Sequence, residues 1–148
     1  MMDTTKISEI LALKGGTVWH ISPNATVFDA VQMMAEKNVG ALAVVENGRL
    51  VGMVSERDYT RKVILHGKAS KTTPVREILS GQVISVTPDH TVEACLRLMT
   101  EHRIRHLPVL VNNQLAGIIS IGDLVNWIIS AQRTQIEQLQ TYITGLPA

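Results

Sequence analysis

The order of apolar and polar positions predicts an α/β protein. Residues 17–21 and the apolar runs at 41–45 and 50–54 predict strands, and Asn47-Gly48 between the last two is typical of a tight hairpin. Apolar residues at helical spacing follow Thr26, and a second helix is expected from Glu56 to Leu65. The first half of the chain is therefore expected to fold as β-α-β-β-α.

The same order returns at an offset of 65 residues. Gly52-Met53-Val54-Ser55-Glu56-Arg57-Asp58 corresponds to Gly117-Ile118-Ile119-Ser120-Ile121-Gly122-Asp123, and Pro23, Thr26 and Leu42 correspond to Pro88, Thr91 and Leu107. One repeat is too small to bury both faces of its strands. We therefore expect tandem β-α-β-β-α repeats packed face to face with pseudo-twofold symmetry, with equivalent clefts between them.

The expected single module of residues 1–148 divides into four parts. The first repeat covers 17–65, a connection rich in Gly, Ser, Lys, Thr and Pro covers 66–81, and the second repeat covers 82–130. A C-terminal helix and tail cover 131–148, and a short helix from Ile7 to Leu13 precedes the first repeat. The helix at 131–143 is rich in Gln, and its narrow apolar stripe could pack on its own domain or on a second copy.

Composition narrows the possible functions. The chain is 45% hydrophobic and 3% aromatic with a net charge of +1, which indicates an aliphatic core and no overall preference for nucleic acid or membrane. No apolar window is long enough for a membrane span and the first residues do not resemble a targeting segment, so we expect a cytoplasmic protein. The single cysteine, Cys95, has helical spacing and is expected in the core.

The repeated strand-to-helix corner is the candidate for chemistry. A helix start attracts anions, and an ionised Asp58 or Asp123 could bind two vicinal sugar hydroxyls with help from Ser55 or Ser120. Each corner could equally be a capping box that only satisfies amides at the helix start. For one copy alone, capping is the more common role.

Two basic clusters lie near these corners. Arg57 and Arg61 share one helix face, where a bound phosphate or plain solvent could face them. Arg105 and His106 replace Gly40 and Ala41 of the first repeat, so the two clefts should differ chemically.

Metal binding and catalysis have weaker support. The five histidines lack the spacing of a metal site, and no nucleophile or acid–base pair stands out. We expect no metal and no enzymatic activity. Few aromatic residues accompany the basic clusters, which argues against nucleic acid as a partner.

The doubled Pro-x-x-Thr-Val starts at residues 23–27 and 88–92, the Leu-x-Val strands and the two Gly-x-x-Ser-x-x-Asp corners together resemble the CBS-domain pair, or Bateman module. The resemblance covers residues 17–129, and Ser55-Glu56-Arg57-Asp58-Tyr59 is similar to small stand-alone bacterial pairs. It implies a regulatory module that binds an adenosyl ligand, namely AMP, ADP, ATP, NAD or S-adenosylmethionine. It also implies a homodimer that acts on an unknown regulated protein.

The resemblance further implies two sites shared between the repeats. The first would use Thr17, Val18, Trp19, Gly40, Ala41, Ser120 and Asp123. The second would use Ser55, Asp58, Ser80, Val83, Ile84, Arg105 and His106, with Arg57 and Arg61 on phosphates. The alternative is an interaction module that dimerises through paired helices and binds no nucleotide.

Overall fold

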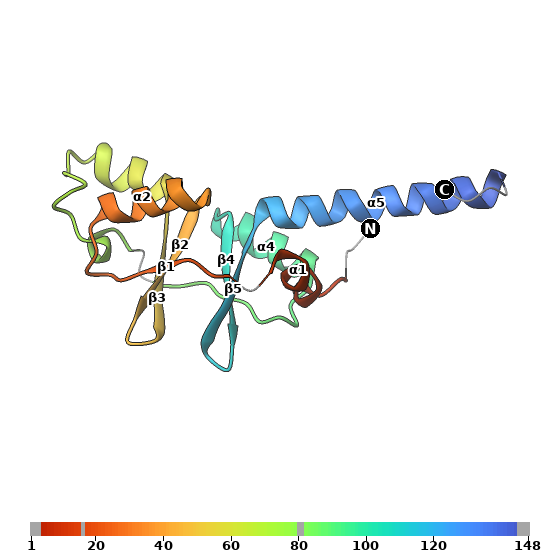
Figure 1. Cartoon of the computed structure of the whole chain (residues 1–148), viewed down its shortest axis with the longest axis horizontal. Coiled ribbons are helices and arrows are strands. Elements are labelled where there is room, and N and C mark those ends of the chain that lie inside the picture. The colour runs from red at the N-terminus through yellow and green to blue at the C-terminus, as the bar shows by residue number, and fades with distance from the viewer. Residues whose placement is uncertain (1–3, 16, 80–81, 145–148) are drawn as a thin grey trace.

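The computed structural model describes residues 4–15, 17–79 and 82–144 and contains two similar halves (Figure 1). The elements of the first half are β1 (His20–Ile21), α2 (Val27–Lys37), β2 (Ala41–Glu46), β3 (Arg49–Ser55), α3 (Glu56–Asp58), the π-helix η1 (Tyr59–Ile64) and the 3-10 helix η2 (Val75–Ile78). Those of the second half are α4 (Val92–His102), β4 (His106–Val111), β5 (Gln114–Ser120) and α5 (Ile121–Thr144). The helix α1 (Ile7–Lys14) precedes both halves in the chain.

Each half is built on one hairpin. The antiparallel pair β2–β3 carries β1 parallel to β2, with Ile21 beside Val44. In the second half β4 and β5 pair alone, and the expected first strand is reduced to a parallel bridge between Val86 and Val109. That bridge lies at the repeat equivalent of the Ile21–Val44 pair. The tandem α/β fold predicted from the sequence is confirmed, with β3 packed against β5 between the halves.

Local sequence signals explain the matching boundaries. Thr26 caps α2 by accepting a hydrogen bond from the Asp29 amide, and Thr91 caps α4 in the same way through Ala94. Both helices end in the left-handed region, at Asn38 with φ 53° and at Arg103 with φ 54°.

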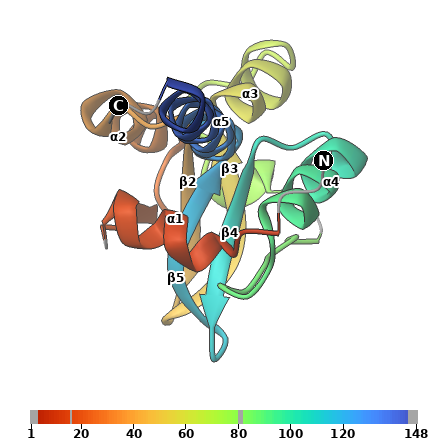
Figure 2. The same ribbon diagram turned by 90° about the vertical axis from the view of Figure 1, so that its right-hand side faces the viewer.

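Each half has its own apolar core, and each core is completed by a segment that lies outside the repeat elements. Val75 and Ile78 of η2 are buried in the first core, while Ile7 and Ile10 of α1 are buried in the second. Figure 2 shows α1 lying beside β5, where the elements are in contact. The N-terminal helix therefore belongs structurally to the second half.

The equivalence of α1 and η2 extends to backbone pairing and glycine placement. Lys6 forms a bridge with Thr91, and Pro74 forms the corresponding bridge with Thr26. A Cβ at Gly117 would lie 2.7 Å from Leu11 Cδ2, and one at Gly52 would lie 2.9 Å from Leu79 Cδ2. These glycines allow the two leucines to approach their hairpins closely.

Two helices differ from the expectation. The helix predicted from Glu56 to Leu65 begins as α3 and continues as the π-helix η1. The C-terminal helix does not start at Ala131, because α5 runs without a break through 24 residues and extends away from the body (Figure 1). Neither Gly nor Pro interrupts the chain from Asp123 to Thr144, so nothing ends the helix at residue 130. No helix in the described ranges combines the length and apolarity needed to cross a membrane.

Candidate functional site

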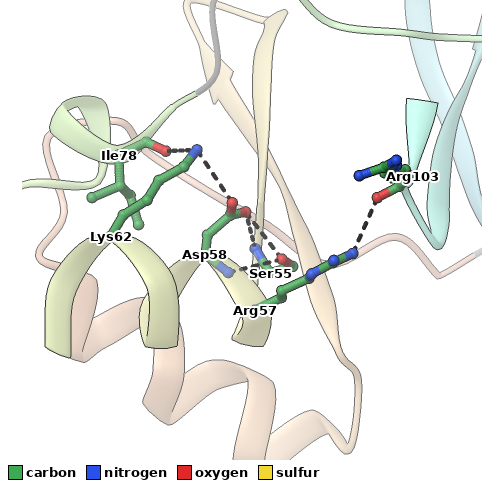
Figure 3. Close-up of polar contacts among 6 residues, drawn as sticks. All are labelled: Ser55, Arg57, Asp58, Lys62, Ile78 and Arg103. Atoms are coloured by element: carbon green, nitrogen blue, oxygen red, sulfur yellow. Dashed lines mark hydrogen bonds and ion pairs between the residues drawn. The ribbon is translucent and has the colours of Figure 1, made fainter. Parts of the chain in front are cut away.

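The first strand-to-helix corner is a complete capping box (Figure 3). Asp58 Oδ2 accepts hydrogen bonds from the Ser55 amide at 2.9 Å and the Ser55 hydroxyl at 3.0 Å, and Ser55 Oγ accepts one from the Asp58 amide at 3.2 Å. The amide of Glu56 donates to the Gly40 carbonyl at 3.1 Å. The capping interpretation is thus confirmed here, and these amides are already bonded within the protein.

The other carboxylate oxygen of Asp58 faces a lysine. Lys62 Nζ lies 3.3 Å from Asp58 Oδ1 and donates to the Ile78 carbonyl at 2.9 Å. Capping on one side and Lys62 on the other hold the half-buried Asp58 side chain in one orientation. A carboxylate has about four lone-pair directions, so these contacts do not saturate it.

Arg57 connects the two halves at this corner. Its guanidinium donates to the Arg103 carbonyl at 3.1 Å, and Arg103 is the left-handed residue that ends α4 (Figure 3). The contact joins two residues 46 positions apart. Any ligand that draws the Arg57 side chain toward itself would compete with this bridge between the repeats.

A cleft of about 910 Å³ opens between the halves beside Asp58. Its volume falls in the range of small-molecule sites. Residues from the first half that line it are Gly40, Ala41, Met53, Ser55, Glu56, Arg57, Asp58, Arg61 and Lys62. Residues from the second half are Gln82, Val83, Ile84, His102, Arg103, Ile104, Arg105 and His106.

The cleft is strongly basic. Five Arg or Lys side chains and two carboxylates are among its described lining residues, an excess of three positive charges with the histidines neutral. The guanidinium groups of Arg61 and Arg105 form no hydrogen bond or ion pair with any residue in the described part of the chain. Guanidinium groups recognise phosphate oxygens with paired N–H donors. The chemistry therefore suits an anion with several oxygens.

The second corner repeats the cap but not its surroundings. Asp123 Oδ2 accepts from the Ser120 amide at 2.8 Å, and Ser120 Oγ accepts from the Asp123 amide at 3.1 Å. Lys14 at the end of α1 donates to the same carboxylate oxygen at 2.7 Å and to the Ile118 carbonyl at 2.7 Å. Partial burial alone would raise the pKa of Asp123, but the hydrogen bonds from Lys14 and Ser120 outweigh it and hold the pKa below its ordinary value.

The basic residues of the first corner have no counterparts in the second. Gly122, Asn126 and Trp127 occupy the positions equivalent to Arg57, Arg61 and Lys62. The sequence contains this difference, and a position-by-position alignment of the two corners would have found it. Within the described residues, the Asp58 corner combines its carboxylate with two arginines and a lysine, whereas the cation at the Asp123 corner, Lys14, is bonded to the carboxylate itself.

His106 lies between the corners. A Cβ at Gly40 would be 3.5 Å from its imidazole, so the two strand starts meet across the pseudo-twofold axis. Burial lowers the pKa of His106, and the positive charge of Lys14 lowers it further, while Asp123 partly offsets these effects. The imidazole is therefore neutral at pH 7, and it can become a second donor when an anion lies nearby.

The structure brings most of the second predicted site together. Ser55, Arg57, Asp58, Arg61, Val83, Ile84, Arg105 and His106 all line the cleft. Ser80 lies outside the described residues.

Two residues of the first predicted site, Gly40 and Ala41, line the cleft of Asp58, because the start of β2 meets His106 across the axis. Ser120, Asp123, Thr17, Val18 and Trp19 do not line the cleft. Trp19 is exposed, and Lys37 Nζ lies 4.4 Å from its ring centroid in a cation–π contact.

Several lining residues were not among the predicted site residues: Met53, Glu56, Lys62, Gln82, His102, Arg103 and Ile104. Lys62 and the stretch His102–Ile104 belong to basic clusters visible in the sequence. Gln82 and Met53 have no signal of their own, because only the packing of the halves places them at the cleft.

Metal and thiol chemistry find no support elsewhere. In residues 4–15, 17–79 and 82–144, no three His, Cys, Asp or Glu side chains are grouped so that they could hold a metal ion. Burial raises the pKa of the Cys95 thiol to about 11, so the thiol is protonated at neutral pH.

Comparisons with known proteins agree on one family. The family model described as "CBS domain" matches residues 17–64 and 75–130. The mitochondrial CBS domain-containing protein CBSX3 of Arabidopsis thaliana is 40% identical over 152 residues, which cover 97% of this chain and 74% of that protein. A putative signal-transduction protein with CBS domains from Burkholderia ambifaria superposes with a TM-score of 0.83 at 46% identity, covering 86% of this chain and 96% of the other.

Two further solved structures bear on ligands and assembly. A hexameric CBS-CP12 protein from bloom-forming cyanobacteria has a TM-score of 0.73 at 35% identity, covering 82% of this chain and 67% of the other. The CBS domain pair of protein MJ0100 was solved with 5′-methylthioadenosine and S-adenosylmethionine, and has a TM-score of 0.77 at 22% identity over 86% of this chain and 98% of that one. The second likeness concerns the fold alone. None of these proteins has an enzymatic name.

Proposed function

Because this chain belongs to the CBS-domain family, with two stretches that match its model, we propose that it is a regulatory module that binds an adenine nucleotide in the cleft beside Asp58. CBS pairs are regulatory modules, and related pairs can bind adenosyl ligands, as in the MJ0100 structure. The observation that carries the proposal is the basic cleft between the halves, which has the volume of a nucleotide site and unpaired guanidinium groups.

The charge of the cleft selects among adenosyl ligands. Three excess positive charges favour ATP and ADP over AMP, and over NAD, whose positively charged nicotinamide ring offsets part of its diphosphate charge. S-adenosylmethionine carries a sulfonium cation and, instead of phosphates, a single carboxylate, so it offers Arg57, Arg61 and Arg105 only one anionic group. We therefore rank the ligands as ATP and ADP first, NAD and AMP next, and S-adenosylmethionine last.

The lining residues suit three parts of a nucleotide. Ala41, Val83 and Ile84 offer an apolar wall for the adenine ring. Asp58, held in place by its cap and by Lys62, can accept hydrogen bonds from two ribose hydroxyls. Arg57 and Arg61 extend along the same helical segment toward the phosphates. Because the Asp123 corner lacks these cations, we expect one nucleotide per chain.

Regulation would follow from the bridge between the halves. A bound phosphate that draws the Arg57 guanidinium away from the Arg103 carbonyl would loosen or rearrange that contact. A ligand shifts such an equilibrium only by the difference in its affinity for the two states. The regulated protein is unidentified, and no step of catalysis is proposed. A cytoplasmic location stays a prediction.

Matched substitutions at the two corners test the proposal. Calorimetry with ATP should show binding to the unmodified protein, a loss of about 10- to 100-fold in affinity for Asp58→Asn, and less than a 2-fold change for Asp123→Asn. The asparagine oxygen can still cap the helix in both variants, so Asp123→Asn controls for effects on folding. Equal affinity in all three proteins, or no binding to any of them, would contradict the proposal.

The second candidate is an interaction module that works without nucleotide. The extended helix α5 favours it, because the outer part of that helix is exposed along an apolar stripe. Self-association suits the family, since the related CBS-CP12 protein is hexameric. A homodimer is our proposal for this chain.

A further inference from the structure

An apolar stripe runs along the whole length of α5. Ile121, Val125, Ile129, Ile136, Leu139 and Ile143 are all exposed, from 40% at Ile121 to 78% at Ile143. At 3.6 residues per turn these side chains fall within roughly 40° of one line along the helix. We call this line the α5 stripe.

The α5 stripe is not the face that α5 turns toward its own domain. Leu124 is fully buried, and Trp127 and Ile128 pack against the second core, so the inner part of α5 uses these residues for intramolecular packing. Val125 and Ile129 belong to the stripe and are exposed at the level of the domain itself. One of the two alternatives for this helix was packing on its own domain. The outer residues of the stripe lie on the same side of α5 as Val125 and Ile129, which are exposed, so this side does not face the domain.

Helix length points to a partner as well. Every residue from Gln132 to Gln140 is exposed, and α5 continues far beyond the rest of the fold (Figure 1). Isolated helices shorter than about 12–15 residues are marginally stable in water, even with favourable composition. Contacts made by the α5 stripe with another molecule would stabilise this outer segment.

The spacing of the stripe identifies the kind of partner. From Val125 onward, its positions are separated by four, three, four, three and four residues, through Ile129, Gln132, Ile136, Leu139 and Ile143. This is the heptad pattern of a coiled coil, with isoleucine at every a position and Leu139 at a d position. The other d positions are Val125 and Gln132, and isoleucine at the a positions with leucine at d favours two strands over three or four when the strands are parallel.

We propose that two copies of this chain pair through the α5 stripe as a parallel two-stranded coiled coil. Gln132, the polar residue of the seam, then faces Gln132 of the other copy, and the two amides can hydrogen-bond to each other. In an antiparallel pair that aligns the same apolar layers, Gln132 would face an isoleucine and the two copies of Arg133 would meet. Charge and polar pairing both favour the parallel arrangement.

A charge placed in the seam tests the pairing. By analytical ultracentrifugation, the unmodified full chain should be a dimer at tens of micromolar, and Ile136→Asp should raise the dissociation constant at least 100-fold. Gln138→Asp adds the same charge on the opposite side of the same helix, away from the α5 stripe, and should leave the dimer intact. A monomeric unmodified chain, or an assembly of any size that Ile136→Asp does not change, would overturn the proposal.

A single cysteine tests the orientation. Ile136→Cys should form an intermolecular disulfide readily under mild oxidation, because equivalent a positions face each other only in a parallel pair. The native Cys95 is buried and does not compete. Gln138→Cys should cross-link far less, and a dimer in which Ile136→Cys does not cross-link would overturn the parallel arrangement.

The pairing does not depend on the proposed nucleotide function. Ile136→Asp should bind ATP with the affinity of the unmodified chain, because the stripe and the cleft share no residue. A monomeric chain that binds ATP would contradict the coiled coil alone. A dimeric chain that binds no ATP would contradict the nucleotide site alone.

Discussion

Asp58 and Asp123 occupy the same position in their repeats and form the same capping contacts, but they face different surroundings. Asp58 lines a basic cleft together with Arg57, Arg61 and Lys62. Asp123 is bonded to Lys14 from the far end of the sequence, 109 positions away, and lies outside that cleft. The cap is a feature of the repeat, whereas the capacity to bind an anion depends on the groups brought to each corner.

This difference explains why a doubled motif need not give two equal sites. Both corners have the serine and the aspartate, along with the strand and helix that carry them. The neighbouring positions differ, so that the first corner has three cations and the second has Gly122, Asn126 and Trp127. A lysine from α1 then neutralises the second carboxylate from within the protein.

The largest effect is expected from removing the cations of the first corner. Arg57→Ala combined with Arg61→Ala should weaken ATP binding by about 100-fold or more, because each guanidinium removed takes away a charged hydrogen bond to phosphate. Calorimetry would measure the loss. Arg97→Ala is the control, since Arg97 pairs with Glu93 on the surface of α4 and does not line the cleft. Equal losses in the double variant and the control would contradict the assignment.

A smaller effect is expected from removing the contact between Lys14 and Asp123 at the second corner. Lys14→Met should raise the pKa of Asp123 toward its ordinary value, because the strongest stabilising contact of the carboxylate is removed. With the native lysine, the low pKa contributes stability that is present above the unfolded-state pKa and is lost as the pH falls through the folded-state pKa.

Carboxyl NMR titration would report the pKa directly, and the cost in unfolding free energy should be no more than about 1 kcal/mol for this partly exposed pair. Lys62→Met, the corresponding change at the first corner, should leave the titration of Asp123 unaltered. An Asp123 titration that Lys14→Met does not move would mean that the two corners differ for another reason.

The smallest expected effect is the contribution of His106 to the pH dependence of stability and of ATP affinity. Its folded-state pKa is lowered, so the stability that it contributes is present above pH 6.5 and is lost as the pH falls through the folded value. A bound phosphate would favour the protonated imidazole, so ATP affinity should rise by about 2- to 3-fold between pH 8 and pH 6 while the stability of the ligand-free protein declines.

Other titratable groups also contribute to changes in ATP affinity and stability between pH 8 and pH 6, so a variant is needed that removes the His106 imidazole alone. Lys14, Asp123 and Arg105 act on His106, Glu56 and Asp58 line the same cleft, and the terminal phosphate itself titrates near pH 6. His106→Gln should remove the part of the pH dependence that belongs to the imidazole. Unchanged pH profiles of affinity and stability in this variant would exclude the proposed role of His106.

Much of this fold could be predicted from the sequence because its signals are local and occur twice. Thr26 and Thr91 mark helix starts, Asn47-Gly48 marks a hairpin, and the offset of 65 residues relates every matching pair. The grouping of Asp58 with Arg105 and His106 also followed from the resemblance to a known family. These inferences did not require knowledge of the packing interface between the two halves.

The remaining features depend on contacts across the interface between the halves. Gly40 and Ala41 were assigned to the Asp123 site, but they line the Asp58 cleft because their strand start meets His106. Lys14 could not be matched with Asp123 by any periodicity, since α1 reaches it only after crossing to the second half. The ribose contact of Asp58 stays a prediction, since the observed contacts of its carboxylate are the cap and Lys62.

The placement of α1 has a practical consequence for anyone who shortens this chain. Expression of residues 17–130 alone, the span within which the family model matches, would delete Ile7 and Ile10 from the second hydrophobic core and remove the Leu11 side chain that packs closely on Gly117. A rearranged gene that places α1 directly ahead of the second repeat would instead keep these buried side chains and make the second lobe contiguous in the chain. In the natural order the first lobe, residues 17–79 with η2, is inserted between α1 and the rest of the second lobe, so residues 82–144 expressed alone would lack part of their core.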